Sequence, residues 1–212
     1  METNQNITQR FSRLDDIYRK IKEYEKDYSK IRRDGFESFY GEILTAKKLV
    51  DEGFCIESLR KEGCDILLGN RKRIEVKTSR LVKRFSACKN EGYGWDISES
   101  QWKNKKFDYA ICLALEYFNG EHGILAFSYG EVIKNFTFSS WNYMNSGKRV
   151  KDHYSLSLIP GGIESFENFI KDARKKSGFD GEPSDFERRL NENPDKIFEK
   201  YSWERFIPEL KK

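Results

Sequence analysis

The sequence predicts an α/β protein with a mixed central β-sheet flanked by helices. Two observations support this class: apolar residues recur at helical spacing ahead of the first strand-like segment, and helical segments then alternate with strand-like ones. A long N-terminal helix and a helical C-terminal region complete the pattern. The 212 residues are enough for one sizeable domain, and the order of the elements indicates a single domain with a mixed sheet.

Two helices are predicted ahead of the strands. Apolar residues in 7–32 lie three, four or seven positions apart, as in a long amphipathic helix, and Gly35 suits its C-terminal cap. A second helix is predicted over 36–52, with Gly53 at its end. The long first helix either covers the sheet within one chain or pairs with a second copy of the chain.

Strand-like segments follow at 54–59, 64–69 and 73–79, and the Gly69–Asn70 turn predicts that the last two form a hairpin. No element is predicted for the polar, aromatic stretch 80–97, after which Ser98 is a candidate N-cap of a short helix.

A second group of elements follows that short helix. The expected elements are a hairpin of strands 107–118 and 122–130, a helix over 130–136, a surface loop over 137–151, a strand over 152–160, and two or three short helices within 163–206. Pro183 and Pro194 are expected near helix starts.

Composition excludes several classes of protein. The 39 basic and 35 acidic residues leave a formal net charge of +4, so a nucleic-acid surface has to come from local clusters of Lys and Arg. Without a run of about 18 apolar residues, no membrane span is expected. The N-terminus does not have the basic-then-apolar pattern of a signal peptide. Four scattered cysteines without a CxxC pair argue against a zinc site or disulfide framework and favour the cytoplasm.

One stretch, "GCDILLGNRKRIEVKTSR" at 63–80, places acidic residues within predicted strands. Glu75 and Lys77 are two positions apart, so they share one face of their strand. Asp65 begins the neighbouring strand of the hairpin, and Glu42 lies on the helix just upstream. The alternative interpretation is an edge hairpin whose polar face points to solvent.

Convergence of these side chains has a chemical consequence. Carboxylates brought close together raise one another's pKa unless a cation joins them. Hard oxygen ligands suit Mg²⁺, which commonly takes one or two carboxylates and leaves other positions for water and phosphate. A nearby lysine can orient or deprotonate an attacking water. Acids and a lysine around a divalent cation are therefore the groups needed to hydrolyse a phosphodiester.

The helical Glu42, the "CD" at 64–65 and the "IEVK" at 74–77 resemble the PD-(D/E)XK nuclease superfamily, which includes restriction endonucleases and archaeal Holliday-junction resolvases. The resemblance covers roughly residues 36–130. It implies that Asp65 and Glu75 bind the metal, that Glu42 binds it directly or through water, and that Lys77 is catalytic. It also implies that the backbone carbonyl of Val76 is a ligand. Cys64 stands where the motif has proline, a residue that members of the family often lack.

The resemblance implies a restriction-endonuclease-like fold and a Mg²⁺-dependent endonuclease, with Mn²⁺ able to substitute, that cuts double-stranded DNA and leaves 5′-phosphates. The additions to a minimal core favour a type II restriction enzyme that acts as a homodimer at a specific site. We divide the single domain 1–212 into an N-terminal helical extension (1–34), a catalytic core (36–136), and a DNA-contact loop with a helical tail (137–212). The alternatives are a Holliday-junction resolvase and an inactive DNA-binding module on a nuclease fold.

Basic and polar residues near these motifs are the candidate DNA contacts. They are Ser79, Arg80, Lys83 and Arg84 after the catalytic strand, Gln101 and Lys103 in the short helix, and Asn142, Met144, Asn145, Lys148 and Arg149 in the predicted loop. Gln101 matches a position from which residues in the family often assist the site. Met144 either wedges between base steps or, as we favour, pins the loop to the core.

Overall fold

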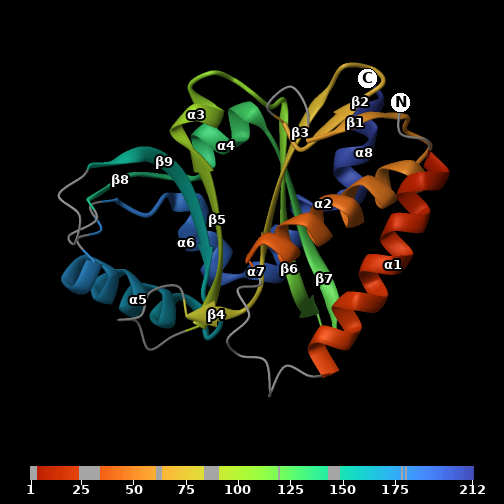
Figure 1. Ribbon diagram of the computed structural model, residues 1–212. Helices are drawn as coiled ribbons and strands as arrows, with labels where there is room; N and C mark the ends of the chain where they lie inside the picture. The colour runs from red at the N-terminus through yellow and green to blue at the C-terminus, as the bar shows by residue number, and fades with distance from the viewer. Residues whose placement is uncertain are drawn as a thin grey trace.

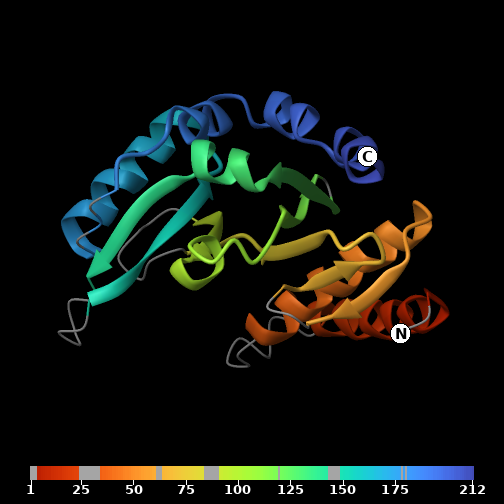
Figure 2. The same ribbon diagram turned by 90° about the horizontal axis from the view of Figure 1, so that it is seen from above.

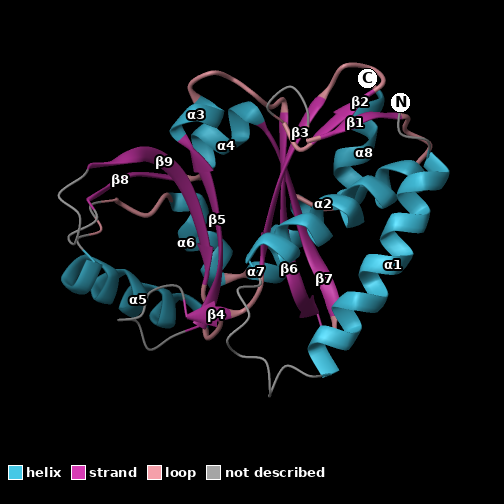
Figure 3. Cartoon of the chain, viewed as in Figure 1, coloured by secondary structure: helices cyan, strands magenta, loops and turns pink. Residues whose placement is uncertain are grey.

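The computed structural model describes residues 4–23, 34–60, 64–83, 91–118, 120–142, 149–177, 179 and 181–212. Two β-sheets lie at its centre, and helices cover their outer faces (Figures 1 and 3). The predicted α/β class, with a mixed sheet, an N-terminal helix and C-terminal helices, is confirmed.

The first sheet has five strands in the order β1-β2-β3-β6-β7. Their bounds are β1 Ile56–Leu59, β2 Ile66–Leu68, β3 Arg73–Ser79, β6 Tyr109–Phe118 and β7 Glu121–Ser128. The β2–β3 and β6–β7 pairs are antiparallel, which confirms both predicted hairpins, and β3 runs parallel to β6. The connection from β3 to β6 leaves this sheet and passes through the second one.

The second sheet is antiparallel and has the order β4-β5-β9-β8. Its strands are β4 Val82–Lys83, β5 Glu91–Ser98, β9 Arg149–Leu158 and β8 Thr137–Asn142. The stretch 80–97, for which no element was predicted, therefore contains β4 and most of β5. The predicted surface loop 137–151 is also wrong in part, because β8 and the first residues of β9 are strands. In β5, Tyr93, Trp95 and Ile97 are buried at alternate positions, but intervening glycines and an aspartate weaken the strand pattern.

Three helices cover one face of the five-stranded sheet. They are α1 Asn4–Glu23, α2 Asp34–Asp51 and α8 Trp203–Lys211 (Figure 1). Ile7 of α1 is fully buried in the same core cluster as Tyr40 and Leu44 of α2. Tyr18 of α1 stacks on Tyr40, with ring centroids 4.5 Å apart. The first helix therefore covers the core within its own chain. Residues 24–32 of the predicted helix lie outside the described part of the chain.

The other face of this sheet packs against the second sheet, and Figure 2 shows the two halves of the molecule from above. Three helices join this core: α4 Tyr129–Asn135, α6 Asp185–Glu192 and α7 Pro194–Lys200. Helix α5, Gly162–Ser177, packs on a smaller cluster around Phe166. The C-terminal region thus has four helices where two or three short ones were predicted. Pro194 occupies the first turn of α7, as expected.

No helix within the described residues is both long enough and apolar enough to cross a membrane. Among the three cysteines that the structure describes, Cys64 and Cys112 are buried and Cys55 is exposed.

Candidate active site

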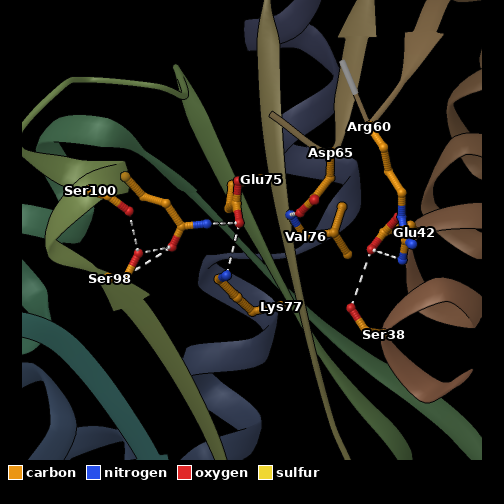
Figure 4. A network of polar contacts seen from close by, with 10 residues as sticks. Ser38, Glu42, Arg60, Asp65, Glu75, Val76, Lys77, Ser98 and Ser100 are labelled. Atoms are coloured by element: carbon orange, nitrogen blue, oxygen red, sulfur yellow. Dashed lines mark hydrogen bonds and ion pairs between the residues drawn. The ribbon is translucent and has the colours of Figure 1, made fainter. Parts of the chain in front are cut away.

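The five-stranded sheet opens at Asp65. Strands β2 and β3 pair only through Ile66 with Ile74 and Leu67 with Arg73, and the Asp65 amide then donates to the carbonyl of Ile74 at 3.2 Å. Past this point, the Val76 amide donates at 2.7 Å to Oδ2 of Asp65 (Figure 4). A side-chain carboxylate thus takes the place of the next backbone acceptor, and it is held at the open edge of β3.

The carbonyl of Val76 lies at the same edge. In a strand, the N–H and C=O groups of one residue point toward the same neighbouring strand. Because the Val76 amide points toward Asp65, its carbonyl also points to the side that β2 has left. The carbonyl that the resemblance implies as a ligand therefore points to the same side of β3 as the Asp65 carboxylate.

Glu75 and Lys77 lie on the face of β3 that is turned toward the second sheet, as their spacing predicts. The Lys77 ammonium is 2.8 Å from Oε1 of Glu75, and the Glu75 side chain is 2% exposed (Figure 4). Val76 points to the opposite face and packs in the core with the helices. The lysine is thus fixed in position by a buried carboxylate.

Helix α3, Glu99–Trp102, presents Gln101 to Glu75. The Gln101 side-chain oxygen accepts from the Ser98 amide at 3.0 Å and the Ser98 hydroxyl at 2.9 Å, so the predicted N-cap forms a capping box. This leaves the amide nitrogen to donate to Oε1 of Glu75. Gln101 therefore lies in the candidate site, as predicted, and its role as an assisting residue stays a prediction.

Replacing Gln101 with glutamate is expected to lower the free energy of unfolding by about 1 kcal/mol at pH 8. Glutamate keeps the capping acceptor but sets a second carboxylate against Glu75. The penalty should shrink at pH 4, where the introduced carboxyl takes up a proton. Urea denaturation at both pH values measures this difference. An equal loss at both would indicate a damaged cap instead of charge repulsion.

Glu42 reaches the site from α2 because that helix lies unusually close to β3. A Cβ atom at Gly41 would stand 1.8 Å from Oγ1 of Thr78, so glycine is needed for this approach. Glu42 is 3% exposed, and its Oε1 accepts from the Nη2 of Arg60 at 2.7 Å and from the Ser38 hydroxyl at 3.2 Å (Figure 4). Arg60 also donates through Nε to Oε2 of Glu42.

Arg60 is the site residue that the sequence analysis missed. It follows β1 directly and belongs to no motif, so spacing alone did not single it out. The charge balance could have indicated it. Glu42, Asp65 and Glu75 carry more negative charge than Lys77 can neutralise, so a further cation was to be expected near them. The structure shows a second cation at this cluster.

Asp65 lies between the charges of the two glutamates. The pKa of Asp65 is raised from 3.8 to about 7, mainly by burial and also by the negative charges of Glu75 and Glu42, while the Val76 amide and Lys77 act in the opposite direction. A divalent cation beside Asp65 would offset this negative charge, and carboxylate and carbonyl oxygens are the ligands that Mg²⁺ prefers. In chemical type, the residues therefore fit the predicted cation.

The acidic side chains do not form a ready-made cluster. Within the described part of the chain, no three side chains of His, Cys, Asp or Glu are gathered so that they could hold a metal ion. Glu42 is engaged by Arg60, and Glu75 by Lys77 and Gln101. Asp65 and the Val76 carbonyl can offer oxygen atoms to a metal ion as they lie, whereas Glu42 is held by Arg60.

The candidate DNA contacts near β3 have unequal positions. Ser79 is 8% exposed, and its hydroxyl accepts from the Gly94 amide at 2.9 Å, a contact that ties β5 to β3. This burial argues against the predicted DNA contact from Ser79. Arg80 pairs with Glu37 of α2 at 2.8 Å, and Lys103, the residue after α3, pairs with Glu99 of that helix. Both cations are part-exposed, so their predicted contacts stay open to test.

The remaining candidate contacts lie at or beyond the limits of the described residues. Lys83 is in β4, and Asn142 and Arg149 face each other at the ends of β8 and β9, but the structure describes none of these three side chains. Arg84, Met144, Asn145 and Lys148 fall in segments outside the description, so their predicted contacts with DNA and the two interpretations of Met144 remain predictions.

Comparison with known proteins does not assign this site to a family. No protein-family model matches the chain, and no curated protein matches it. The functional interpretation therefore depends on the geometry around Asp65.

Proposed function

We propose that this chain is a Mg²⁺-dependent endonuclease of the PD-(D/E)XK type that hydrolyses phosphodiester bonds in double-stranded DNA, with Mn²⁺ able to replace Mg²⁺. One observation carries the proposal. The Asp65 carboxylate is held at the open edge of β3 beside the carbonyl side of Val76, while Glu75 and Lys77 project from the same strand.

In the proposed mechanism, Asp65, Glu75 and the Val76 carbonyl would hold the cation, and Glu42 would join them directly or through water. When bound, the cation supplies a Lewis acid for the phosphoryl oxygens and lowers the pKa of the attacking water. Lys77, held by Glu75 at 2.8 Å, orients that water and offsets charge that develops on the phosphate. The cut leaves a 5′-phosphate, as the family resemblance implies.

A type II restriction enzyme is the form of this activity that the architecture supports best. The four-stranded sheet and the helices α5 to α8 add a large surface to the core around β3, which suits sequence-specific recognition better than a minimal resolvase. A homodimer would bring one such site to each strand of the duplex. We place the enzyme in the cytoplasm, where its DNA substrate is.

The decisive experiment incubates the purified protein with plasmid and phage DNA, and separately with a four-way junction, in Mg²⁺ or in EDTA. We expect discrete fragments of duplex DNA in Mg²⁺ and none in EDTA. Cleavage of the junction alone would indicate a resolvase. DNA binding without Mg²⁺-dependent cleavage of any substrate would contradict the proposal and indicate a binding module on a nuclease fold.

A further inference from the structure

An arginine holds Glu42, one of the candidate metal ligands. Both oxygens of the Glu42 carboxylate accept from the Arg60 guanidinium, one from Nε and one from Nη2 at 2.7 Å (Figure 4). The Glu42 side chain is 5% exposed and that of Arg60 is 51% exposed. The guanidinium thus joins a buried carboxylate on one side and reaches solvent on the other.

The backbone also ties Arg60 to the site. Its amide donates at 2.8 Å to the carbonyl of Asp65, and its φ of 53° lies in the left-handed region that is unfavourable for a residue with a Cβ atom. The guanidinium carbon lies 4.8 Å from the centre of the Phe39 ring, so this ring offers it a second contact. Arg60 is therefore held next to Asp65 through its backbone, whichever anion its side chain binds.

Arg60 and a divalent cation compete for the same atoms. A carboxylate whose two oxygens both accept from one guanidinium, with the Ser38 hydroxyl also on Oε1, has little capacity left for a metal ligand bond. Three of its roughly four acceptor positions are taken, so we expect Arg60 to release at least one oxygen when Glu42 ligates the cation. Because the two cations compete for one carboxylate, a change at Arg60 that weakens its pair with Glu42 should strengthen metal binding.

We propose that Arg60 is the counter-ion of Glu42 in the metal-free protein, that it yields Glu42 to the divalent cation, and that its guanidinium then binds a phosphate of the DNA. This inference rests on the proposed nuclease function. A guanidinium matches phosphate oxygens with the same two-point geometry that it uses for a carboxylate. The phosphate offers Arg60 a new partner, so DNA and metal should each strengthen the binding of the other.

The test measures Mn²⁺ binding by calorimetry in the absence of DNA, for the unaltered protein and for Arg60→Gln. We expect the variant to bind Mn²⁺ about fivefold more tightly or better, because a competing cation has been removed. In Ca²⁺, the same variant should bind a short DNA duplex about fivefold more weakly, because a phosphate contact is lost.

Arg71 provides a matched control. It too is an arginine with positive φ, 67°, and it donates to a glutamate, Glu57, at 2.8 Å. It lies in the β2–β3 turn, at the other end of β2 from Asp65. Arg71→Gln should leave both the Mn²⁺ and the DNA dissociation constants unchanged.

Arg60→Gln leaves the buried Glu42 without its cation, so the variant should melt at a lower temperature in EDTA and recover in Mn²⁺. If it does not fold, Arg60→Lys takes its place, with a smaller gain in Mn²⁺ affinity expected because lysine offers only a single point of contact. Normal Mn²⁺ binding by the unaltered protein with no gain in the folded Arg60 variant would overturn the role of Arg60 alone. No Mn²⁺ binding by the unaltered protein would contradict both this role and the proposed function.

Discussion

The Asp65→Asn protein is expected to cleave DNA about 10³-fold more slowly than the unaltered protein and yet, without metal, to be more stable at pH 8. The loss of activity follows from the proposed role of Asp65 as a metal ligand. The gain in stability follows from the shape of asparagine, whose side-chain oxygen can still accept from the Val76 amide while carrying no charge into the buried site.

The sign of the pH effect follows from the pKa of Asp65, which is raised from 3.8 to about 7 in the folded protein. Between about pH 4 and 7, the folded protein keeps a proton that the unfolded chain has lost, so its stability falls as the pH rises through this window. Asparagine does not titrate. We therefore expect the variant to gain about 2 kcal/mol in the free energy of unfolding at pH 8.

Urea denaturation in EDTA at pH 4 and pH 8 measures this effect. The two proteins should differ little at pH 4, where Asp65 is protonated in the folded protein and about half protonated in the unfolded chain, and should differ most at pH 8. Addition of Mn²⁺ should then stabilise the unaltered protein and leave the variant unchanged. A variant that is less stable at both pH values would show that the carboxylate stabilises the fold, contrary to our account.

The Gly41→Ala protein is expected to lose about 3 kcal/mol of stability, although alanine favours helix formation over glycine by about 1 kcal/mol. The new methyl group would lie 1.8 Å from Oγ1 and 2.9 Å from Cβ of Thr78. To relieve this overlap, α2 has to move away from β3. That movement would carry Glu42 away from Asp65, so DNA cleavage should fall as well.

Gly130→Ala is the matched control, because Gly130 is also helical and a Cβ atom there would meet nothing within 4 Å. This control should be neutral or slightly stabilising. The Oγ1 atom of Thr78 is buried and has no hydrogen-bond partner within the described part of the protein. Thr78→Ala should therefore restore part of the stability in the double variant. No recovery would show that the loss arises elsewhere.

The sequence by itself determined the local features of the site. Glu75 and Lys77 share a face because side chains alternate along any strand, and the Gly69–Asn70 turn set Asp65 near them by joining two short strands. Helix α2 and the N-cap at Ser98 were likewise predictable, because helical periodicity and capping depend on residues a few positions apart.

Only the tertiary structure decided which distant segments meet. Strand β5 pairs with β9, which is more than 50 residues away in the chain, and a strand pattern weakened by glycine gives little indication of such a partner. Burial of Ser79 and contact of Gln101 with Glu75 follow from the packing of the second sheet against β3. The ion pair of Glu42 with Arg60 follows from the packing of α2 beside β1. Local periodicity reports on a residue's own element, whereas the partner of a buried charge is set by the packing of several elements together.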